Sequence, residues 1–312
     1  MTDVAQRREF DVETAAWPAL PYEDWRETRD TLHMYTQVIG KLRLALCPFE
    51  PQWANVPLYL TARGLNTTLM PAGPRSFDAE FDFVDHVLVM RSSDGVVTRR
   101  PLGGPVADFY ASVMSDLETL DVDVTFSVLP SEVTDPIRFP EDRSHRTYDP
   151  EFARRFWRVL SSIDAVLKEH RARFSGRTTP VQFFWGTFDL ALARFSGRPA
   201  SMGAKAGIIE RLSGNAELIA AGWWPGDERH PSPAFYAYAH PKPEGVERAA
   251  ILGPKAGWDA NAGEFLMPYS AVQAAVDPRA AIVDFLDSTY RVGAKLLGWP
   301  DELTEVESPT RE

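Results

Sequence analysis

Two titratable side chains in this sequence, His33 and Asp189, are candidates for proton exchange with a bound molecule. His33 belongs to a polar series, Arg29, His33, Gln37 and Lys41, which recurs every four residues. Residues spaced in this way share one face of a helix, and an imidazole that faces a cleft can act as an acid or a base. The alternative is that the series forms the solvent-exposed edge of an amphipathic helix.

Asp189 ends the segment FFWGTFD and is followed by further apolar residues. Phe183 and Trp185 fall on one face of an extended strand, and Gly186 interrupts the pattern, as at a bulge or a close backbone approach. A carboxylate in such surroundings needs a hydrogen bond or an ion pair. Asp189 is therefore a candidate catalytic residue, with a salt bridge to an arginine as the alternative, and we expect Trp185 to form an apolar wall.

Arginines are the candidate anion-binding groups. The hexapeptide ARFSGR occurs at residues 172–177 and again at 193–198. The first copy is explained by a helix end, where basic side chains complement the helix dipole. In the second copy, Arg194 and Arg198 share one side of a turn, and guanidinium groups suit carboxylate or phosphate recognition. We predict both as anion anchors, with Arg63 as the equivalent from the first half; a salt-bridged turn is the alternative.

Aromatic and acidic residues form two further alternating faces. In AFYAYAH, Tyr236 and Tyr238 share one face, and tyrosine suits the wall of a wet cavity. We predict Tyr236 to contact a ligand; a half-exposed sheet face is the alternative. In FDAEFDF, Asp78, Glu80 and Asp82 share one face, which we interpret as facing solvent.

No motif in the sequence indicates a metal or a cofactor, and we expect neither. The six histidines are scattered, and HExxH, the glycine-rich nucleotide motifs and GxSxG are all missing. The 33 basic and 44 acidic residues give a net charge of −11, which argues against a nucleic-acid partner. No stretch approaches the ~18 apolar residues of a membrane span. The single cysteine, Cys47, excludes an internal disulfide, and no signal peptide is apparent, so we predict a cytoplasmic protein.

One basic block lies within this acidic chain. Residues 151–200 contain nine basic and four acidic side chains, a balance of +5. Such a block could dock on an acidic partner or on a second copy of the chain. A non-catalytic interaction or self-association module is therefore the alternative function, and the sequence leaves the oligomeric state open.

The order of predicted elements repeats along the chain. Helical spacing over 22–46, alternating segments typical of antiparallel strands, and a helix over 106–120 are followed by a helix over 149–174, more strands and a closing helix over 278–297. A strand is also predicted over 122–128. We predict an α+β fold of two similar halves, each helix–antiparallel strands–helix, with helices covering the sheets and a possible internal duplication. The predicted parts are a first half (1–130), a connecting segment (131–148), a second half (149–300) and an acidic tail (301–312).

Seven segments distributed over the chain resemble a known family. They are WPALPYEDW (17–25), TLHMYTQVIGKLRL (31–44), VPLYLTARGL (56–65), FDFVDH (81–86), FPEDRSHRTYDPE (139–151), FFWGTFDLALARFSGR (183–198) and AFYAYAHP (234–241). Together they resemble an uncharacterised bacterial family known as domain of unknown function 5996. The resemblance implies one folding unit over nearly the whole chain, and it implies no activity, cofactor or catalytic residue.

The sequence thus predicts a small-molecule binding protein or enzyme. Its pocket lies near the interface of the two halves and favours an anionic metabolite. The candidate catalytic residues are His33 and Asp189, and the candidate ligand-binding residues are Arg63, Trp185, Arg194, Arg198 and Tyr236. We expect these side chains to converge on one concave pocket.

Overall fold

Two antiparallel sheets of six strands each form the framework of the protein, which the computed structural model describes at residues 17–203 and 205–303. This confirms the α+β class. None of the described helices is long and apolar enough to cross a membrane. The six described α-helices are α2 (Tyr22–Leu46), α3 (Val106–Thr119), α4 (Pro150–Ala172), α5 (Ile208–Ser213), α6 (Tyr269–Gln273) and α7 (Pro278–Leu297).

The first sheet has the order β1-β2-β4-β5-β6, and β3 also pairs with β4. Its strands are β1 (Tyr59–Leu60), β2 (Gly64–Asn66), β3 (Met70–Ala72), β4 (Arg75–Asp82), β5 (Val87–Ser92) and β6 (Val97–Pro101). The expectation that the acidic face of β4 is open to solvent is wrong for two of its three carboxylates. Glu80 and Asp82 are buried, because Arg91 and Arg63 lie over them with nitrogen–oxygen distances of 2.5 Å.

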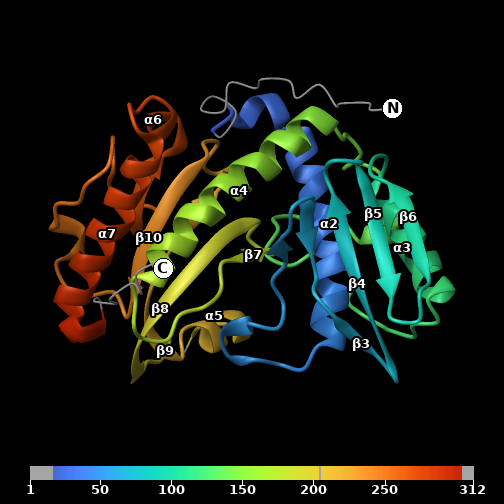
Figure 1. The fold of residues 1–312 in the computed structure, drawn as a ribbon, viewed down its shortest axis with the longest axis horizontal. Coiled ribbons are helices and arrows are strands. Elements are labelled where there is room, and N and C mark those ends of the chain that lie inside the picture. Colours follow the sequence, from blue (N-terminus) through green and yellow to red (C-terminus); the bar gives the residue numbers. More distant parts are fainter. Residues whose placement is uncertain (1–16, 204, 304–312) are drawn as a thin grey trace, which may run out of the picture.

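The second sheet has the order β11-β12-β10-β9-β8-β7. Its strands are β7 (Gln182–Phe184), β8 (Asp189–Pro199), β9 (Ala216–Trp224), β10 (Ala234–His240), β11 (Gly257–Asp259) and β12 (Glu264–Pro268). Helices α4 and α7 pack on one face of this sheet (Figure 1), where Leu190, Trp223 and Phe235 enter the main core. The side chains that alternate with these three point to the opposite face.

The two sheets meet at their edges. Leu58, just before β1, and Phe183 in β7 form an antiparallel bridge in which each backbone N–H donates to the other's carbonyl at 2.9 Å. Helix α2 stands between the sheets in Figure 1. Its whole polar series is buried, so the solvent-edge alternative for that series is wrong.

The strand expected over 122–128 does not form, although its alternation has a physical origin. Val122, Val124, Phe126 and Val128 pack against the main core while the side chains between them are exposed. Alternation reports which side chains face the core, and it does not require a neighbouring strand for the backbone.

Candidate functional site

A cavity of about 1010 Å³ lies over the face of the second sheet that α4 and α7 leave uncovered. Strands β8, β9 and β10 supply its floor. Helix α2, residues 131–134, residues 52–53 and helix α5 supply its other walls. The cavity therefore lies between the second sheet and elements of the first half.

Small residues on the floor make the space. An alanine or glycine on a sheet face leaves the room that a larger side chain would fill. The lining also includes large rings, from Trp53, Trp185 and Trp224, which give the cavity apolar walls. Cross-strand pairing forms two rows on the floor: Ala191–Gly222–Tyr236 and Ala193–Ala220–Tyr238.

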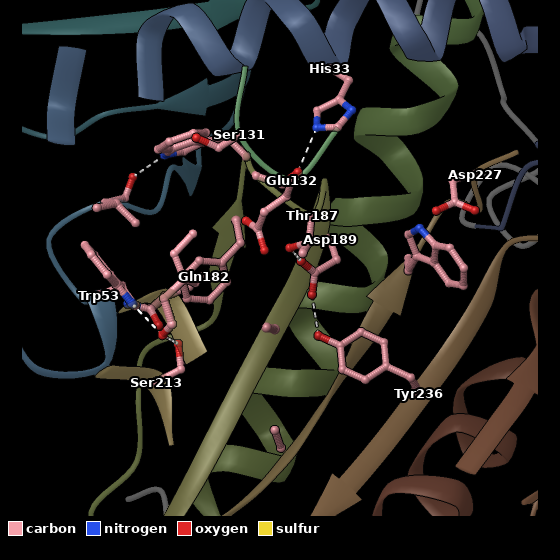
Figure 2. Close-up of a pocket in the computed structure, with 18 of the residues that line it drawn as sticks. His33, Trp53, Ser131, Glu132, Gln182, Thr187, Asp189, Ser213, Asp227 and Tyr236 are labelled. Carbon is pink, nitrogen blue, oxygen red and sulfur yellow. Dashed lines mark hydrogen bonds between the residues drawn. The ribbon is translucent and has the colours of Figure 1, made fainter. Parts of the chain in front are cut away.

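Asp189 is the most deeply placed carboxyl group of this cavity, with only 8% of the residue exposed. The Thr187 hydroxyl donates to its Oδ1, and the Tyr236 hydroxyl, reaching from β10, donates to its Oδ2 (Figure 2). Burial raises the pKa of the Asp189 carboxyl, while the two hydroxyl donors oppose that rise. A buried carboxyl group beside a cavity can exchange a proton with a bound molecule.

His33 points from α2 toward the cavity and its ring is 4.9 Å from that of Phe188. Its Nε2–H donates to the carbonyl of Gly186 at 2.9 Å, which fixes the backbone just before Thr187. Burial, assisted by the charge of Arg29, lowers the pKa of His33 to about 3. The imidazole is therefore neutral at physiological pH, and its visible contact positions the turn that carries Asp189.

The segment after Pro130 is tied to α2 and brings a second carboxyl group to the cavity. The Gln37 side-chain amide donates to the Ser131 carbonyl at 2.8 Å and accepts from the Ser131 N–H at 3.0 Å, and Lys41 Nζ donates to Ser131 Oγ at 2.7 Å. Glu132 follows, and its Oε2 lies only 2.2 Å from where a Cβ on Gly186 would be. Gly186 therefore permits a close approach, as the sequence indicates.

The cavity lining is locally acidic around Asp189. Burial, assisted by the negative charge of Asp189, raises the pKa of Glu132. Burial, with Asp189 and Asp259 nearby, raises the pKa of Glu264 to about 7. None of the ion pairs between described residues includes Glu132, Asp189 or Glu264, and no basic side chain acts on their pKa values. Within the described ranges, no group of three or more His, Cys, Asp or Glu could hold a metal ion.

The three predicted arginine anchors lie elsewhere, so the expected convergence on one pocket is wrong for them. Arg194 is 3% exposed, donates to the His170 carbonyl, and stacks 4.4 Å from the ring of Tyr290. Arg198 pairs with Glu217 at 2.7 Å. The Arg63 guanidinium pairs with two aspartates of the first sheet, Asp82 at 2.5 Å and Asp85 at 2.8 Å. Each of these guanidinium groups is occupied by the protein itself.

The other four candidates, His33, Trp185, Asp189 and Tyr236, all line the cavity. Residues 17–306 match the model of the DUF5996 family, a family of unknown function. The chain belongs to the DUF5996 family. No curated protein and no solved structure matches it. The family match includes both sheets and every residue of the cavity, so the DUF5996 unit contains the whole candidate site.

Several residues of the DUF5996 cavity were not predicted as site residues. Thr187 and Glu132 lie in loops, where no periodicity marks them. Glu264 is the first residue of β12, and only the order of strands brings β12 beside β10. Beneath the lining, between Ala191 and Tyr236, Gly222 carried the clearest signal. It follows Ala220 on the same face of ELIAAGWW, and small residues at alternate positions indicate that something occupies the space above them.

The lowered pKa of His33 predicts an acid-sensitive contribution to stability. An unfolded histidine binds a proton below about pH 6.5 and folded His33 does not, so stability is lost as the pH falls from about 6.5 toward 3, by up to roughly 4 kcal/mol. We expect His33→Gln, which keeps an N–H donor, to lose less stability over this range in urea unfolding.

His145 is the matched control, because Asp142 raises its pKa and gives the opposite sign. Its ion pair stabilises the folded state at low pH and is lost as the pH rises through its folded pKa. His145→Gln should therefore make the protein more acid-sensitive. Equal acid sensitivity in wild type and His33→Gln would show that His33 is not buried as a neutral group.

Proposed function

We propose that this protein is a small-molecule binding protein or enzyme whose ligand occupies the cavity between the halves. The observation that carries the proposal is Asp189, buried beneath a cavity of about 1010 Å³ with hydroxyl donors on both oxygens and no basic partner. A carboxyl group in this setting can recognise a hydrogen-bond donor or transfer a proton. In this proposal Asp189 is the catalytic or recognition group, and His33 positions the turn that presents it.

The cavity lining favours a cationic over an anionic ligand. Two arginines line the cavity, but Arg29 pairs with Asp30 at 2.9 Å and Arg229 pairs with Asp227 at 3.1 Å. The proposed arginine anchors are used in ion pairs and stacking outside it, whereas Glu132, Asp189 and Glu264 face it. Carboxylates attract a cationic group, and the aromatic walls suit an apolar body or a cation–π contact. We therefore propose a ligand that combines a protonated amine with an apolar or aromatic body.

A thermal-shift comparison of matched pairs tests this ligand class. Each pair has the same hydrocarbon skeleton with either an amine or a carboxylate, for example 2-phenylethylamine against 3-phenylpropanoate. A ligand that binds only the folded state raises the melting temperature, by a few degrees at ~100 times its Kd. We expect members of the amine series to raise it; shifts confined to the carboxylates would contradict the proposal and favour an anionic ligand.

The raised pKa of Glu264 predicts that amine binding depends on pH. Glu264 loses its proton as the pH rises through about 7, and the new negative charge attracts the ammonium group. We expect affinity to rise by roughly fivefold between about pH 6 and about pH 8, equivalent to about 1 kcal/mol of Coulomb attraction. Titration calorimetry should find this dependence in wild type and a weaker one in Glu264→Gln, where Glu132 and Asp189 remain.

The interaction module based on residues 151–200 is the alternative, and the contacts of its arginines weaken it. Arg155 pairs with Glu151, Arg173 pairs with Asp287, and Arg194 is buried. A docking surface needs basic side chains that remain available to a partner. Size-exclusion chromatography with light scattering tests the self-association form of this alternative, and a concentration-dependent dimer lost in Arg155→Glu would support it.

We also propose that the two halves arose by duplication. Each contains a long helix, six antiparallel strands and a later helix, although in the second half α5 lies between β8 and β9 and α6 precedes α7. The Leu58–Phe183 bridge joins the corresponding edges, at β1 and β7. The division into residues 1–130 and 149–300, and a cytoplasmic location, remain predictions from the sequence.

A further inference from the structure

Gly222 lies in β9 between two residues of the cavity lining, and its own backbone dihedral angles do not require glycine. It pairs with Ala191 of β8 on one side and with Tyr236 of β10 on the other. A Cβ at this position would be 2.5 Å from the Tyr236 hydroxyl oxygen and 2.2 Å from the Leu190 carbonyl oxygen. The missing side chain therefore leaves a notch in β9, and the phenol ring of Tyr236 occupies it.

The notch lets a side chain of one strand reach a partner two strands away. The Tyr236 ring crosses β9 above Gly222, and its hydroxyl donates to Asp189 Oδ2 on β8. Only 9% of Tyr236 is exposed. Thr187 donates to the other oxygen of Asp189. Since a hydroxyl donates one hydrogen and can still accept, both donors leave acceptor capacity at the cavity surface for a ligand.

We infer that Tyr236 is a positioning residue that holds Asp189 as an oriented, ionisable carboxyl group at the cavity surface. This arrangement depends on Gly222, because the missing side chain leaves the space that the Tyr236 ring occupies. The inference rests on the proposed function, in which Asp189 meets the ligand. A ring that only filled space would serve equally well without its hydroxyl. The phenol oxygen is therefore the atom to test.

The test measures the pKa of Asp189 in the ligand-free protein. A pH titration with carbon-detected NMR of the labelled carboxyl group gives this pKa. A hydroxyl donor favours the ionised carboxylate, so Tyr236→Phe should raise the pKa of Asp189 by about one unit. The ring and its packing remain in this variant. Tyr238→Phe is the matched control: Tyr238 lies on the same face, 6.4 Å from the Tyr236 ring, and none of the described hydrogen bonds joins it to Asp189.

Gly222→Ala provides a second perturbation of the same contact. Its new methyl group would press on the Tyr236 hydroxyl as well as on the nearer Leu190 carbonyl. The pKa of Asp189 should therefore rise in the same direction while Tyr236 itself is intact. If this variant does not fold, Tyr236→Phe still decides the question. An unchanged pKa in Tyr236→Phe, or an equal rise in Tyr238→Phe, would overturn the inference.

This measurement separates the inference from the function on which it rests. It uses no ligand, so a shift in Tyr236→Phe supports the positioning role even if every amine fails to bind. Conversely, amine binding with an unmoved pKa would leave the cavity proposal intact and refute the role of Tyr236.

Discussion

Asp189→Asn should weaken binding of the cavity ligand at least tenfold and leave the protein as stable as wild type or more stable. The loss of binding follows because a hydrogen bond to a charged group contributes about 1.5–3 kcal/mol. The gain in stability follows because Asp189 is buried and has no basic partner, so removing its charge removes an unfavourable desolvation. One of the Thr187 and Tyr236 hydroxyls can rotate to accept from the new amide N–H, while the other still donates to the amide oxygen.

Titration calorimetry with the best amine of the matched series and urea unfolding measure the two quantities. Asp116→Asn is the matched control, since Asp116 is fully buried but is paired with Arg100 at 2.7 Å, and neither residue lines the cavity. We expect Asp116→Asn to lose stability and keep binding, the opposite of Asp189→Asn. If Asp189→Asn binds the amine as well as wild type does, Asp189 is not the recognition group.

Gly40→Ala should destabilise the protein by about 2 kcal/mol or more, although alanine is the better helix former by ~1 kcal/mol. Gly40 lies inside α2, directly against the indole ring of Trp185. A Cβ there would come within 2.2–2.3 Å of three atoms of that ring. Trp185 cannot move away cheaply, because it is 5% exposed and its Nε1–H donates to the Val56 carbonyl at 2.9 Å.

Gly293→Ala is the control for this prediction. Gly293 is also buried inside a helix, α7, but its new methyl group would meet the flexible end of Ile219 at 3.0 Å. Chemical denaturation of both variants isolates the contact with Trp185, because the gain in helix propensity is shared. Equal effects of the two substitutions would mean that the ring of Trp185 does not press on α2.

The sequence predicted elements well where spacing alone determines them. Helix α2 begins at Tyr22 and ends at Leu46 as expected, because Pro21 and Pro48 delimit a regular apolar stripe. Helix α4 begins after Asp149, whose side chain accepts from two backbone N–H groups of the first turn. Such signals are local, so they can be read without knowing which strands are neighbours.

The candidate site was predictable only in part, because its assembly depends on long-range pairing. His33, Trp185, Asp189 and Tyr236 were identified from local patterns and all line the cavity. Arg194 stands out equally in the sequence, but it lies one residue out of phase with Ala193 and Phe195, so it projects to the opposite face of β8. A one-residue difference in strand position thus separates a cavity wall from a buried structural cation.

The charge of the cavity illustrates the same limit. The basic block of residues 151–200 suggested an anionic ligand, but ion pairs and stacking use three of its arginines, Arg173, Arg194 and Arg198. Net charge along a segment describes which residues are present, and it does not determine where their side chains point. Three carboxyl groups of the lining, from Glu132, Asp189 and Glu264, come from three separate parts of the chain.

Binding of an amine to a protein with a filled cavity tests the central claim most directly. Ala220 lies on the floor between Ala193 and Tyr238, so Ala220→Trp should fill the space and abolish the thermal shift that the amine causes in wild type. Val276→Trp adds the same side chain at a fully exposed position and should retain the shift. A retained shift in a folded Ala220→Trp protein would contradict the account, because the ligand would then bind outside the cavity.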